Sequence, residues 1–450
     1  MQRRTALAAL FGAPLAFKSG LQAATLRKTD DEFLDDLSRC AFRYFWEQAD
    51  PQTGLILDRA RSTGERVTGG GANVASIAAT GFGLTALAIA SDRNWVRERD
   101  AIERARKTLR FFFNQAENER GWFYHFMDAS SGQRVWNSEA SSIDTALLLA
   151  GVLTVRDKFR DPEISWLAAQ IYARIDFPWM LDGDSNLLSH GWTPENGFLP
   201  HRWDRFSELP LLYILAIGSP RSPISPASWY AWQRPTVTYA GFTYVNGPPP
   251  LFAYQYPQAW IDMRALRDGD PSSIDYFHNS TVATRAHRAY CLEMSSKFPR
   301  SYSENVWGIT ASDSAKGYVD WGIAPCKVEI DGTVVPCAAA GSLMFAPDIC
   351  VPAVRTMWER FGDRIWGRYG FCDAFNPTTG WIDPDVLGID QGITLVSAEN
   401  LRGGNVWRWF MGNAEIPKAL ELCRFHRDSD PRTEVARREL MRQFTLVNRK

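Results

Sequence analysis

The chain has 450 residues, of which 45% are hydrophobic, and its formal net charge is -1. This length suits one large domain or two ordinary ones, and the lack of a basic excess argues against nucleic acid as a partner, because phosphates are bound by cations. Aromatic residues make up 13% of the chain and include 18 Trp. Tryptophan faces suit either a large helical core or a neutral, ring-shaped ligand such as a sugar.

Residues 1–24 have the pattern of an export signal. Two arginines precede a short apolar stretch, and small residues follow at 21–24. The Arg3-Arg4 pair is compatible with the twin-arginine route and leaves the general route open. No later stretch is apolar enough to cross a bilayer. We therefore expect a mature protein of residues 25–450 that is periplasmic or secreted, with no membrane contact after signal removal.

Helical periodicity dominates the remaining chain and predicts an all-α fold. Segments that are apolar nearly all round alternate with amphipathic ones. An apolar helix must be covered on every side, whereas an amphipathic helix covers it from outside. The alternation therefore predicts a ring with an inner and an outer helical layer, about six helices in each. The predicted helices are 29–49, 75–91, 97–114, 140–155, a segment after Pro162, 206–220, 257–267, 275–297, 347–361, 391–400, 414–424 and 431–447.

Three stretches between these helices are long and rich in Gly, Pro and aromatic residues: 179–203, 218–256 and 301–345. Loops of this length are uncommon unless they are functional. The last of them is expected to hold a short hairpin around Asp331-Gly332. Since the sequence shows neither an internal repeat nor a convincing linker, we expect one domain over residues 25–450.

Acidic residues precede or open several of the predicted inner helices. Consecutive helices in such a ring run antiparallel, so every second helix begins at the same end. The carboxylates at these starts are therefore expected to gather at one rim, together with the long loops and short β-hairpins. They are Glu139, Asp144, Asp204, Glu208, Asp383, Asp385 and Asp390.

Two of these carboxylates stand out as candidates for acid–base chemistry. Acids in a first helical turn also stabilise the helix dipole, and that alternative stays open for most of the set. Glu208 is followed directly by a strongly apolar run, which would raise its pKa and suit a general acid. Asp390 lies between small residues that permit close approach of a ligand and would suit a base. Two carboxylates that flank a glycosidic bond are the minimal equipment for its hydrolysis.

Other side chains near these acids in sequence are candidates for substrate binding. The Arg59 guanidinium could hydrogen-bond sugar hydroxyls, and tryptophans could stack on sugar rings. For each aromatic, core packing remains the alternative. The tryptophans are Trp136, Trp192, Trp203 and Trp381.

Metal and cofactor chemistry is not expected from the motifs. The chain lacks H-E-x-x-H and G-x-S-x-G, and "TGGGAN" has no phosphate-loop Lys. The stretch "DGDSN" resembles the start of a calcium loop but lacks the required Gly and Glu. The seven cysteines show no C-x-x-C spacing, so zinc is not expected. Cys326, Cys337 and Cys350 either bridge in an oxidising compartment or stay buried thiols.

Several stretches, in order along the mature chain, resemble the bacterial glucoamylase-like family that includes the endo-β-1,2-glucanases, also called sophorohydrolases. The stretches are "FRYFWEQADPQTGLILDRA", "SIAATGFGLTALAIA", "SSIDTALLLAG", "FSELPLLYILAIGSP", "WGITASD", "DGTVVPCAAAGSL" and "DAFNPTTGWIDPDVLGIDQG". The resemblance implies an (α/α)6 barrel that hydrolyses β-1,2-glucan with inversion. A related domain of cyclic β-1,2-glucan synthases acts as a transglycosylase.

The resemblance also implies roles for individual residues. Glu208 matches the family's glutamate and is the expected acid; Asp390 is the expected base, with Asp373 as its close rival. Glu139 is expected in the substrate-binding shell, and Asp144, Asp313 and Tyr254 are further predicted substrate-binding residues. Tyr254 stands where the family pattern has a His, and Pro257-Gln258 replace a more polar pair, which leaves the exact linkage open.

The expected activity is an inverting hydrolase that releases sophorose or short oligosaccharides from β-1,2-glucan, as a monomer or weak homo-oligomer and without a cofactor. Two alternatives stay open. One is an exo-acting or transglycosylating relative on the same substrates. The other is a non-catalytic glucan-binding protein. Product analysis separates the first from the main hypothesis, and loss of activity in Glu208→Gln excludes the second.

Overall fold

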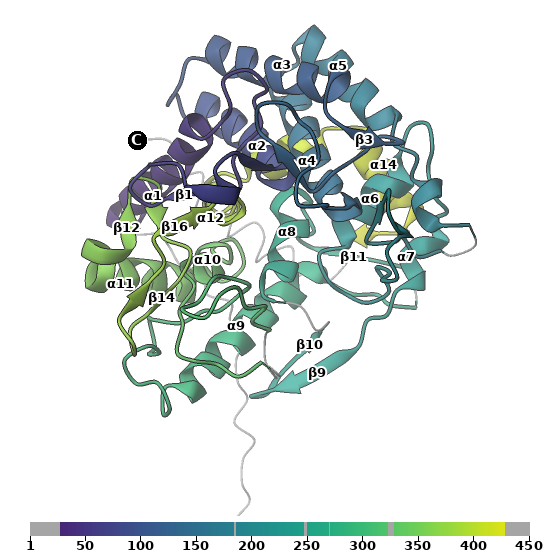
Figure 1. Cartoon of the computed structure of the whole chain (residues 1–450). Coiled ribbons are helices and arrows are strands. Elements are labelled where there is room, and N and C mark those ends of the chain that lie inside the picture. The colour runs from purple at the N-terminus through teal and green to yellow at the C-terminus, as the bar shows by residue number, and fades with distance from the viewer. Residues whose placement is uncertain (1–27, 184–185, 247–249, 270, 323–327, 428–450) are drawn as a thin grey trace, which may run out of the picture.

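The computed structural model describes residues 28–183, 186–246, 250–269, 271–322 and 328–427. Over these residues the fold is mostly helical with short strands, in the order shown in Figure 1. The predicted export signal and the predicted helix 431–447 lie outside the described residues. None of the described helices is both long and apolar enough to span a membrane.

Helices that are buried on every side form the centre of the molecule. Every residue of α6 is buried, as is all of α2 up to Ser91. Helix α2 packs against α4 and α12, α4 against α6, α6 against α8, and α8 against α12, so the five close a ring. A short helix, α10, packs against α12 from the side. These helices are α2 (Ile77–Asp92), α4 (Ser142–Phe159), α6 (Pro210–Gly218), α8 (Phe252–Trp260), α10 (Pro336–Ala340) and α12 (Gly388–Arg402).

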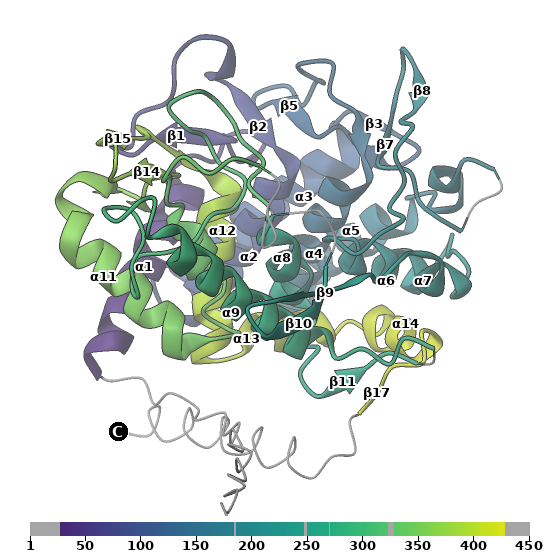
Figure 2. The ribbon, with the colours of Figure 1, turned by 90° about the horizontal axis from the view of Figure 1, so that it is seen from below.

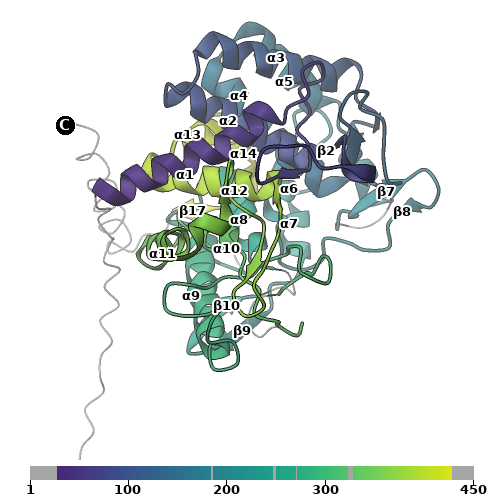
Figure 3. The same ribbon diagram turned by 60° about the vertical axis from the view of Figure 1, so that its left-hand side comes forward.

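Further helices cover this centre from outside. The N-terminal helix α1 lies along α12, so residues far apart in sequence are side by side (Figure 3). Helices α3 and α5 pack on each other, α13 packs on α4, and α14 packs on α6. The outer helices are α1 (Lys28–Glu47), α3 (Glu98–Asn114), α5 (Pro162–Ala173), α7 (Ala227–Ala231), α9 (Tyr276–Met294), α11 (Pro347–Ile365), α13 (Asn405–Met411) and α14 (Glu415–Leu422).

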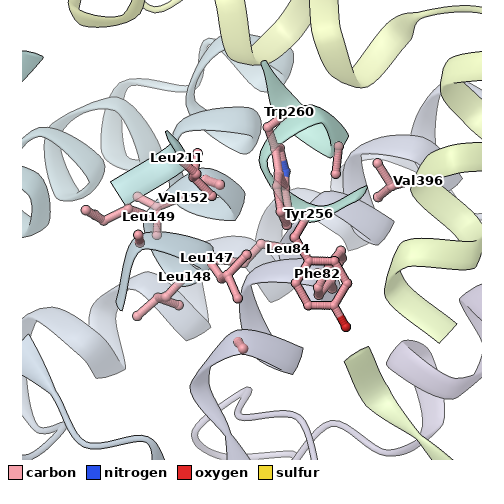
Figure 4. Close-up of a cluster of buried hydrophobic side chains, with 14 of the residues drawn as sticks. Phe82, Leu84, Leu147, Leu148, Leu149, Val152, Leu211, Tyr256, Trp260 and Val396 are labelled. Atoms are coloured by element: carbon pink, nitrogen blue, oxygen red, sulfur yellow. The ribbon is translucent and has the colours of Figure 1, made fainter. Parts of the chain in front are cut away.

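Large apolar side chains from the central helices meet in the middle of the ring (Figure 4). The Phe82 ring of α2 lies 4.8 Å from the Trp260 ring of α8, centroid to centroid. The indole of Trp260 satisfies its N–H by donating to Thr85 Oγ1 at 3.0 Å. Leu147, Val152, Leu211 and Val396 add contacts from α4, α6 and α12 (Figure 4). Because all five helices contribute, this core fixes their relative positions.

Helices α2 and α4 approach each other through two glycines. A Cβ at Gly151 would lie 2.1 Å from the Gly81 carbonyl oxygen, and one at Gly81 would lie 2.2 Å from the Leu147 oxygen. The nearest atoms are backbone, which cannot turn aside as a flexible side chain can. The contact between α2 and α4 therefore requires glycine at both positions.

Many of the short strands lie on one side of the helices, while α13 and α14 lie on the other side with a few short strands beside them (Figure 2). Local antiparallel hairpins are β3–β4 (Asn118–Glu119, Trp122–Phe123), β7–β8 (Gly191–Thr193, Gly197–Phe198), β9–β10 (Thr236–Tyr239, Phe242–Val245), β12–β13 (Trp366–Gly367, Gly370–Phe371) and β14–β15 (Phe375–Asn376, Trp381–Ile382). Strand β11 (Leu266–Arg267) pairs with β17 (His426–Arg427) near α14.

Five other strands tie the starts of central helices together. Strand β16 (Asp385–Leu387) runs into α12 and pairs with β1 (Arg59–Arg61). Strand β2 (Val74–Ser76) runs into α2 and pairs with β5 (Phe126–Asp128), while β6 (Ala140–Ser141) runs into α4 and pairs with β7. Single bridges, Leu57 to Ala75 and Tyr124 to Ala140, join these pairs into one ribbon. The ribbon aligns the starts of α12, α2 and α4.

The predicted helices agree with the observed ones except in their bounds and in three short cases. Helix α8 begins at Phe252, five residues before the predicted start at 257, because Pro257 lies inside the helix. Helices α7, α10 and α13 were not predicted, since each has seven residues or fewer and shows little periodicity. The predicted hairpin at Asp331-Gly332 is wrong over the described residues 328–345: Val334 bridges Phe375, and α10 follows directly.

Replacing Gly151 with Ala tests the contact between α2 and α4. We expect Gly151→Ala to lower the free energy of unfolding by about 3 kcal/mol or more, because the methyl group meets the Gly81 backbone. Gly362→Ala on outer helix α11 is the matched control. There a Cβ meets only the Trp358 side chain, at 3.3 Å, and the free energy of unfolding should change by about 1 kcal/mol or less. Urea denaturation measures both, and equal effects would contradict the prediction.

Candidate active site

Carboxyl groups from four segments form a buried cluster at the start of α12. Asp390 lies in the first turn of α12, Asp373 follows β13, and Asp383 lies between β15 and β16. Donor atoms of Asp313, Asp373 and Asp383 lie within 4.8 Å of one another. The backbone N–H of Asp313 also donates to Asp373 Oδ2 at 2.8 Å. The strands β14–β15 and β16 bring these acids together although they are distant in sequence.

Asp373 and Asp390 lie close enough for each to change the pKa of the other. Burial and the charge of Asp390 raise the pKa of Asp373 well above its usual range. Burial raises the pKa of Asp390 to about 6, although hydrogen bonds from Asp373 and from the Cys337 thiol lower it. Asp373 is therefore the protonated member that donates, and Asp390 is the member that ionises. This arrangement favours Asp390 over its rival as the base.

Arg59 lies beside this cluster and balances part of its charge. Its Nη1 donates to Asp313 Oδ2 at 2.8 Å, and its Nε donates to Asp58 at 3.1 Å. Arg61 donates to Asp385 Oδ1 at 2.6 Å. The structure thus confirms that Arg59 and Asp313 lie with the acids, held by the β1–β16 pairing.

Glu208 lies two residues before α6 and is partly exposed. Burial, with a smaller contribution from the neighbouring carboxylates of Asp144 and Asp320, raises its pKa to about 7. A carboxylic acid with this pKa keeps a large fraction of its proton at neutral pH. Its position beside the apolar α6 therefore produces the property that a general acid needs.

Glu139 and Asp144 lie on either side of a histidine that the sequence did not single out. His125 Nδ1 is 3.1 Å from Glu139 Oε1, and its Nε2 is 3.6 Å from Asp144 Oδ1. Burial alone lowers the pKa of His125, but Asp144 and Glu139 outweigh it and raise the pKa to about 9. His125 is therefore a cation at neutral pH, and the β4–β5 segment that carries it brings it to the start of α4.

Tyr256 of α8 lies near two of the predicted acids, Glu208 and Asp390. Burial raises the pKa of its phenol well above the ordinary value, and the charges of both Asp390 and Glu208 add to that rise. Since electrostatic effects of this kind weaken with distance, both carboxylates lie within electrostatic reach of one phenol. Tyr318, 67% exposed, also lies within electrostatic reach of Asp390, Asp373 and Asp313.

The predicted aromatic residues separate into exposed and buried sets. Trp136 is 56% exposed and packs edge-on against Phe126, which stacks on His125. Trp136 and Asn137 both have positive φ, so the turn that carries them is strained. Trp192 and Trp381 are partly buried.

Two predicted substrate-binding residues are core residues in the structure. Trp203 is buried, stacks on His190 and donates to Ser142 Oγ at 2.8 Å. Tyr254 is 1% exposed, and its hydroxyl bonds the Val245 carbonyl. Their prediction as surfaces for a ligand is corrected here, because core packing holds both rings.

Two of these groups have donor atoms close enough for a divalent cation: His125 with Glu139 and Asp144, and Asp313 with Asp373 and Asp383. In each, a protein cation already lies against the carboxylates. A protonated histidine is not a metal ligand, and Arg59 occupies one oxygen of Asp313. The negative charge of these carboxylates is thus balanced in part by Arg59 and His125 of the same chain.

The sequence analysis missed several residues of the site. His125, Tyr256, Tyr318, Asp320 and Cys337 lie next to the predicted acids only because distant loops and helices converge. None lies in a spacing pattern that marks chemistry. Tyr256 was visible only as part of an aromatic stretch before Pro257.

A helical ring with several carboxyl groups of raised pKa at one end is compatible with a glycosidase-type site. Comparison with known proteins agrees. Residues 200–414 match the family model described as "Putative glucoamylase". The crystal structure of a putative glucoamylase from Bacteroides uniformis is 30% identical, with a TM-score of 0.82 over 89% of this chain and 98% of that one. The chain belongs to this glucoamylase-like family.

Two further relatives carry more specific descriptions. An endo-β-1,2-glucanase from Chitinophaga pinensis, solved with sophorotriose and glucose, is 26% identical with a TM-score of 0.80, covering 88% of this chain and 98% of that one. An exo β-1,2-glucooligosaccharide sophorohydrolase of Parabacteroides distasonis is 27% identical over 439 residues, or 89% of this chain. The chain spans 59% of the length of that curated relative.

The raised pKa of Glu208 makes a prediction about stability. Its folded-state pKa of about 7 lies above the ordinary value of 4.5, so the folded state binds the proton more tightly than the unfolded state. Wild-type stability should therefore fall as pH rises from 4.5 through about 7. Glu208→Gln lacks this loss, and we expect its thermal midpoint to exceed that of wild type at pH 8 by about 3 °C or more.

At pH 4 the two midpoints should agree more closely, because the wild-type carboxyl is then protonated. Glu304→Gln, at a side chain that is 83% exposed, is the matched control and should show no such pH-dependent difference. Parallel midpoint curves for wild type and Glu208→Gln across this pH range would contradict the assigned pKa.

Proposed function

We propose that this chain is an inverting glycoside hydrolase that cleaves β-1,2-glucan to sophorose or short oligosaccharides. We interpret its helical ring as an (α/α)6 barrel in which α10 is the shortened inner helix. The observation that carries the proposal is that Glu208 and Asp390 both lie within electrostatic reach of Tyr256, with different pKa values and different partners. Family membership and the descriptions of the two relatives support the substrate class.

Glu208 acts as the general acid in this proposal. Its burial keeps a proton available near neutral pH, and it donates that proton to the leaving glycosidic oxygen, directly or through a substrate hydroxyl. Asp144 and Asp320 help because their negative charges oppose loss of the proton from Glu208. The positive charge of His125 weakens the effect of Asp144 on the pKa of Glu208. The contact between His125 and Glu139 orients the Glu139 carboxylate toward the substrate.

Asp390 acts as the general base. It removes a proton from a water molecule as the oxygen of that water attacks the anomeric carbon from the face opposite the leaving group. Asp373 donates a hydrogen bond that holds Asp390 in its ionised form. In an inverting enzyme the two carboxyls stand about 6.5–9.5 Å apart so that the water fits between them and the sugar. The product then has the opposite anomeric configuration.

Endo cleavage and exo cleavage remain the two modes to distinguish. The relative from Chitinophaga pinensis is described as an endo enzyme, and the one from Parabacteroides distasonis as an exo enzyme. Chromatography of products from linear and cyclic β-1,2-glucans separates them. A ladder of lengths indicates endo cleavage, sophorose alone indicates exo cleavage, and products longer than the substrate indicate transfer. We also propose that residues 1–24 export the enzyme to the periplasm or beyond.

Removing either carboxyl group should abolish most of the activity. We expect Glu208→Gln and Asp390→Asn each to lower kcat on β-1,2-glucan by about 10²–10⁴-fold, the usual contribution of a positioned acid or base. Wild-type kcat/KM should be bell-shaped, falling below about pH 6 and above about pH 7. Asp348→Asn is the matched control. It removes the exposed carboxylate of Asp348 on α11, which pairs with Arg285 on α9, and it should keep wild-type activity. Full activity in Glu208→Gln would refute the proposed acid.

Trp136 provides a test of substrate binding. An exposed ring on a strained turn, held against Phe126 beside the His125 group, suits stacking on a glucose unit. We expect Trp136→Ala to raise KM about tenfold with a smaller change in kcat. Trp166→Ala on outer helix α5 is the matched control, because Trp166 is 53% exposed and lies away from the acids. An unchanged KM in Trp136→Ala would remove this residue from the substrate site.

A further inference from the structure

A cavity of about 370 Å³ lies between α1, α2 and α3, away from the carboxylates of the candidate active site. Its apolar wall consists of Phe45, Ile56, Leu84 and Leu87. Three cations, one from the loop between β1 and β2 and two from α3, stand at its other side: Arg66, Arg104 and Lys107. The cavity therefore combines an apolar body with a positively charged mouth.

The three cations have no carboxylate within 4.0 Å among the described residues, although ion pairs are frequent elsewhere on α3. Arg104 Nη1 donates to the Trp46 carbonyl at 2.7 Å, and Lys107 Nζ donates to the Pro51 carbonyl at 2.5 Å. Burial lowers the pKa of Arg104, which means that the loss of solvent is not offset by a neighbouring charge. The positive charge of this wall is left uncompensated.

The two carboxylates that line the cavity are already engaged. Glu47 accepts two hydrogen bonds from Arg368, both of 2.6 Å. Asp50 Oδ1 accepts the backbone N–H groups of Gln52 and Thr53, which closes the turn after α1. Neither carboxylate is paired with a cavity cation, so a negatively charged group from outside would find unpaired donors there.

The aromatic lining does not favour a sugar. The Arg104 guanidinium lies 3.4 Å from the centroid of the Trp46 ring and covers that face. The Phe42 ring packs at 5.7 Å from the same indole, and Phe45 is buried. A glucose unit therefore lacks a free ring to stack on, whereas an apolar group can lie against Leu84 and Leu87.

We propose that this cavity binds a small organic anion whose apolar body lies against α2 and whose carboxylate or phosphate is held by Arg66, Arg104 and Lys107. Charged groups in a half-enclosed apolar site are held more tightly than in open solvent, and pockets of 300–1,000 Å³ are the usual size for small ligands. The site is separate from glycan hydrolysis and does not depend on it.

The test uses the mature chain and two probes of equal shape, 4-phenylbutyrate and its neutral amide, followed by ligand-observed NMR titration. We expect 4-phenylbutyrate to bind with a dissociation constant of about 1 mM or tighter, as its number of atoms allows. The amide should bind at least about tenfold more weakly. Phenyl phosphate in a parallel titration shows whether the phosphate head is held as well as the carboxylate.

Charge reversal identifies the site. Arg66→Glu and Lys107→Glu change exposed residues, so folding is retained, and together they should weaken 4-phenylbutyrate binding about tenfold. Lys418 on α14 is exposed and has no ion pair among the described residues. Lys418→Glu is therefore the control for reversal of a single charge, and it should bind 4-phenylbutyrate like wild type. Equal binding of acid and amide, equal loss in the control, or displacement of 4-phenylbutyrate by sophorose would each overturn the proposal.

Discussion

Backbone pairing of the strands that run into α12, α2 and α4, each with a neighbouring strand, is the interaction on which the site depends. Because β16, β2 and β6 run directly into these helices, each ladder hydrogen bond also fixes where a helix begins. The first turns of α12 and α4 carry Asp390 and Asp144. The strands β1 and β5 belong to the same ribbon, and they bring Arg59 and the segment with His125 to these helix starts. A shift of one residue in the pairing of β1 with β16 would turn Arg59 to the other face of its strand.

The ring of apolar helices supplies the second requirement, which is removal of water from the carboxyl groups. Asp390 is buried, and Glu208 is followed directly by a helix whose every residue is buried. Burial raises both pKa values, but the partners differ: Asp390 receives hydrogen bonds from Asp373 and Cys337, whereas Glu208 faces other carboxylates. The same desolvation therefore acts on two carboxyl groups with different partners, both within electrostatic reach of Tyr256.

Sequence analysis was most successful where the composition of a segment is enough to predict its burial. The apolar composition of residues 75–91 and 140–155 requires burial on all sides, and both are central helices. The apolar run after Glu208 predicted a raised pKa, which the structure confirms. It failed at α10 and α13, whose few residues show no period, and at Tyr254 and Trp203, where an aromatic ring in a sequence suits a core and a ligand surface equally. It also missed His125, since nothing local distinguishes that residue from other histidines.

The sequence by itself determined the helical class, the inner and outer roles of most helices, the acidic residues at their starts and the family resemblance. These properties follow from periodicity, composition and short motifs, which depend only on near neighbours along the chain. Only the tertiary structure decided that Asp373 donates to Asp390, that His125 lies between Glu139 and Asp144, and that Tyr256 lies within electrostatic reach of both Glu208 and Asp390. Those relations join residues more than a hundred positions apart in some cases, and they exist only after the ring has closed and excluded water.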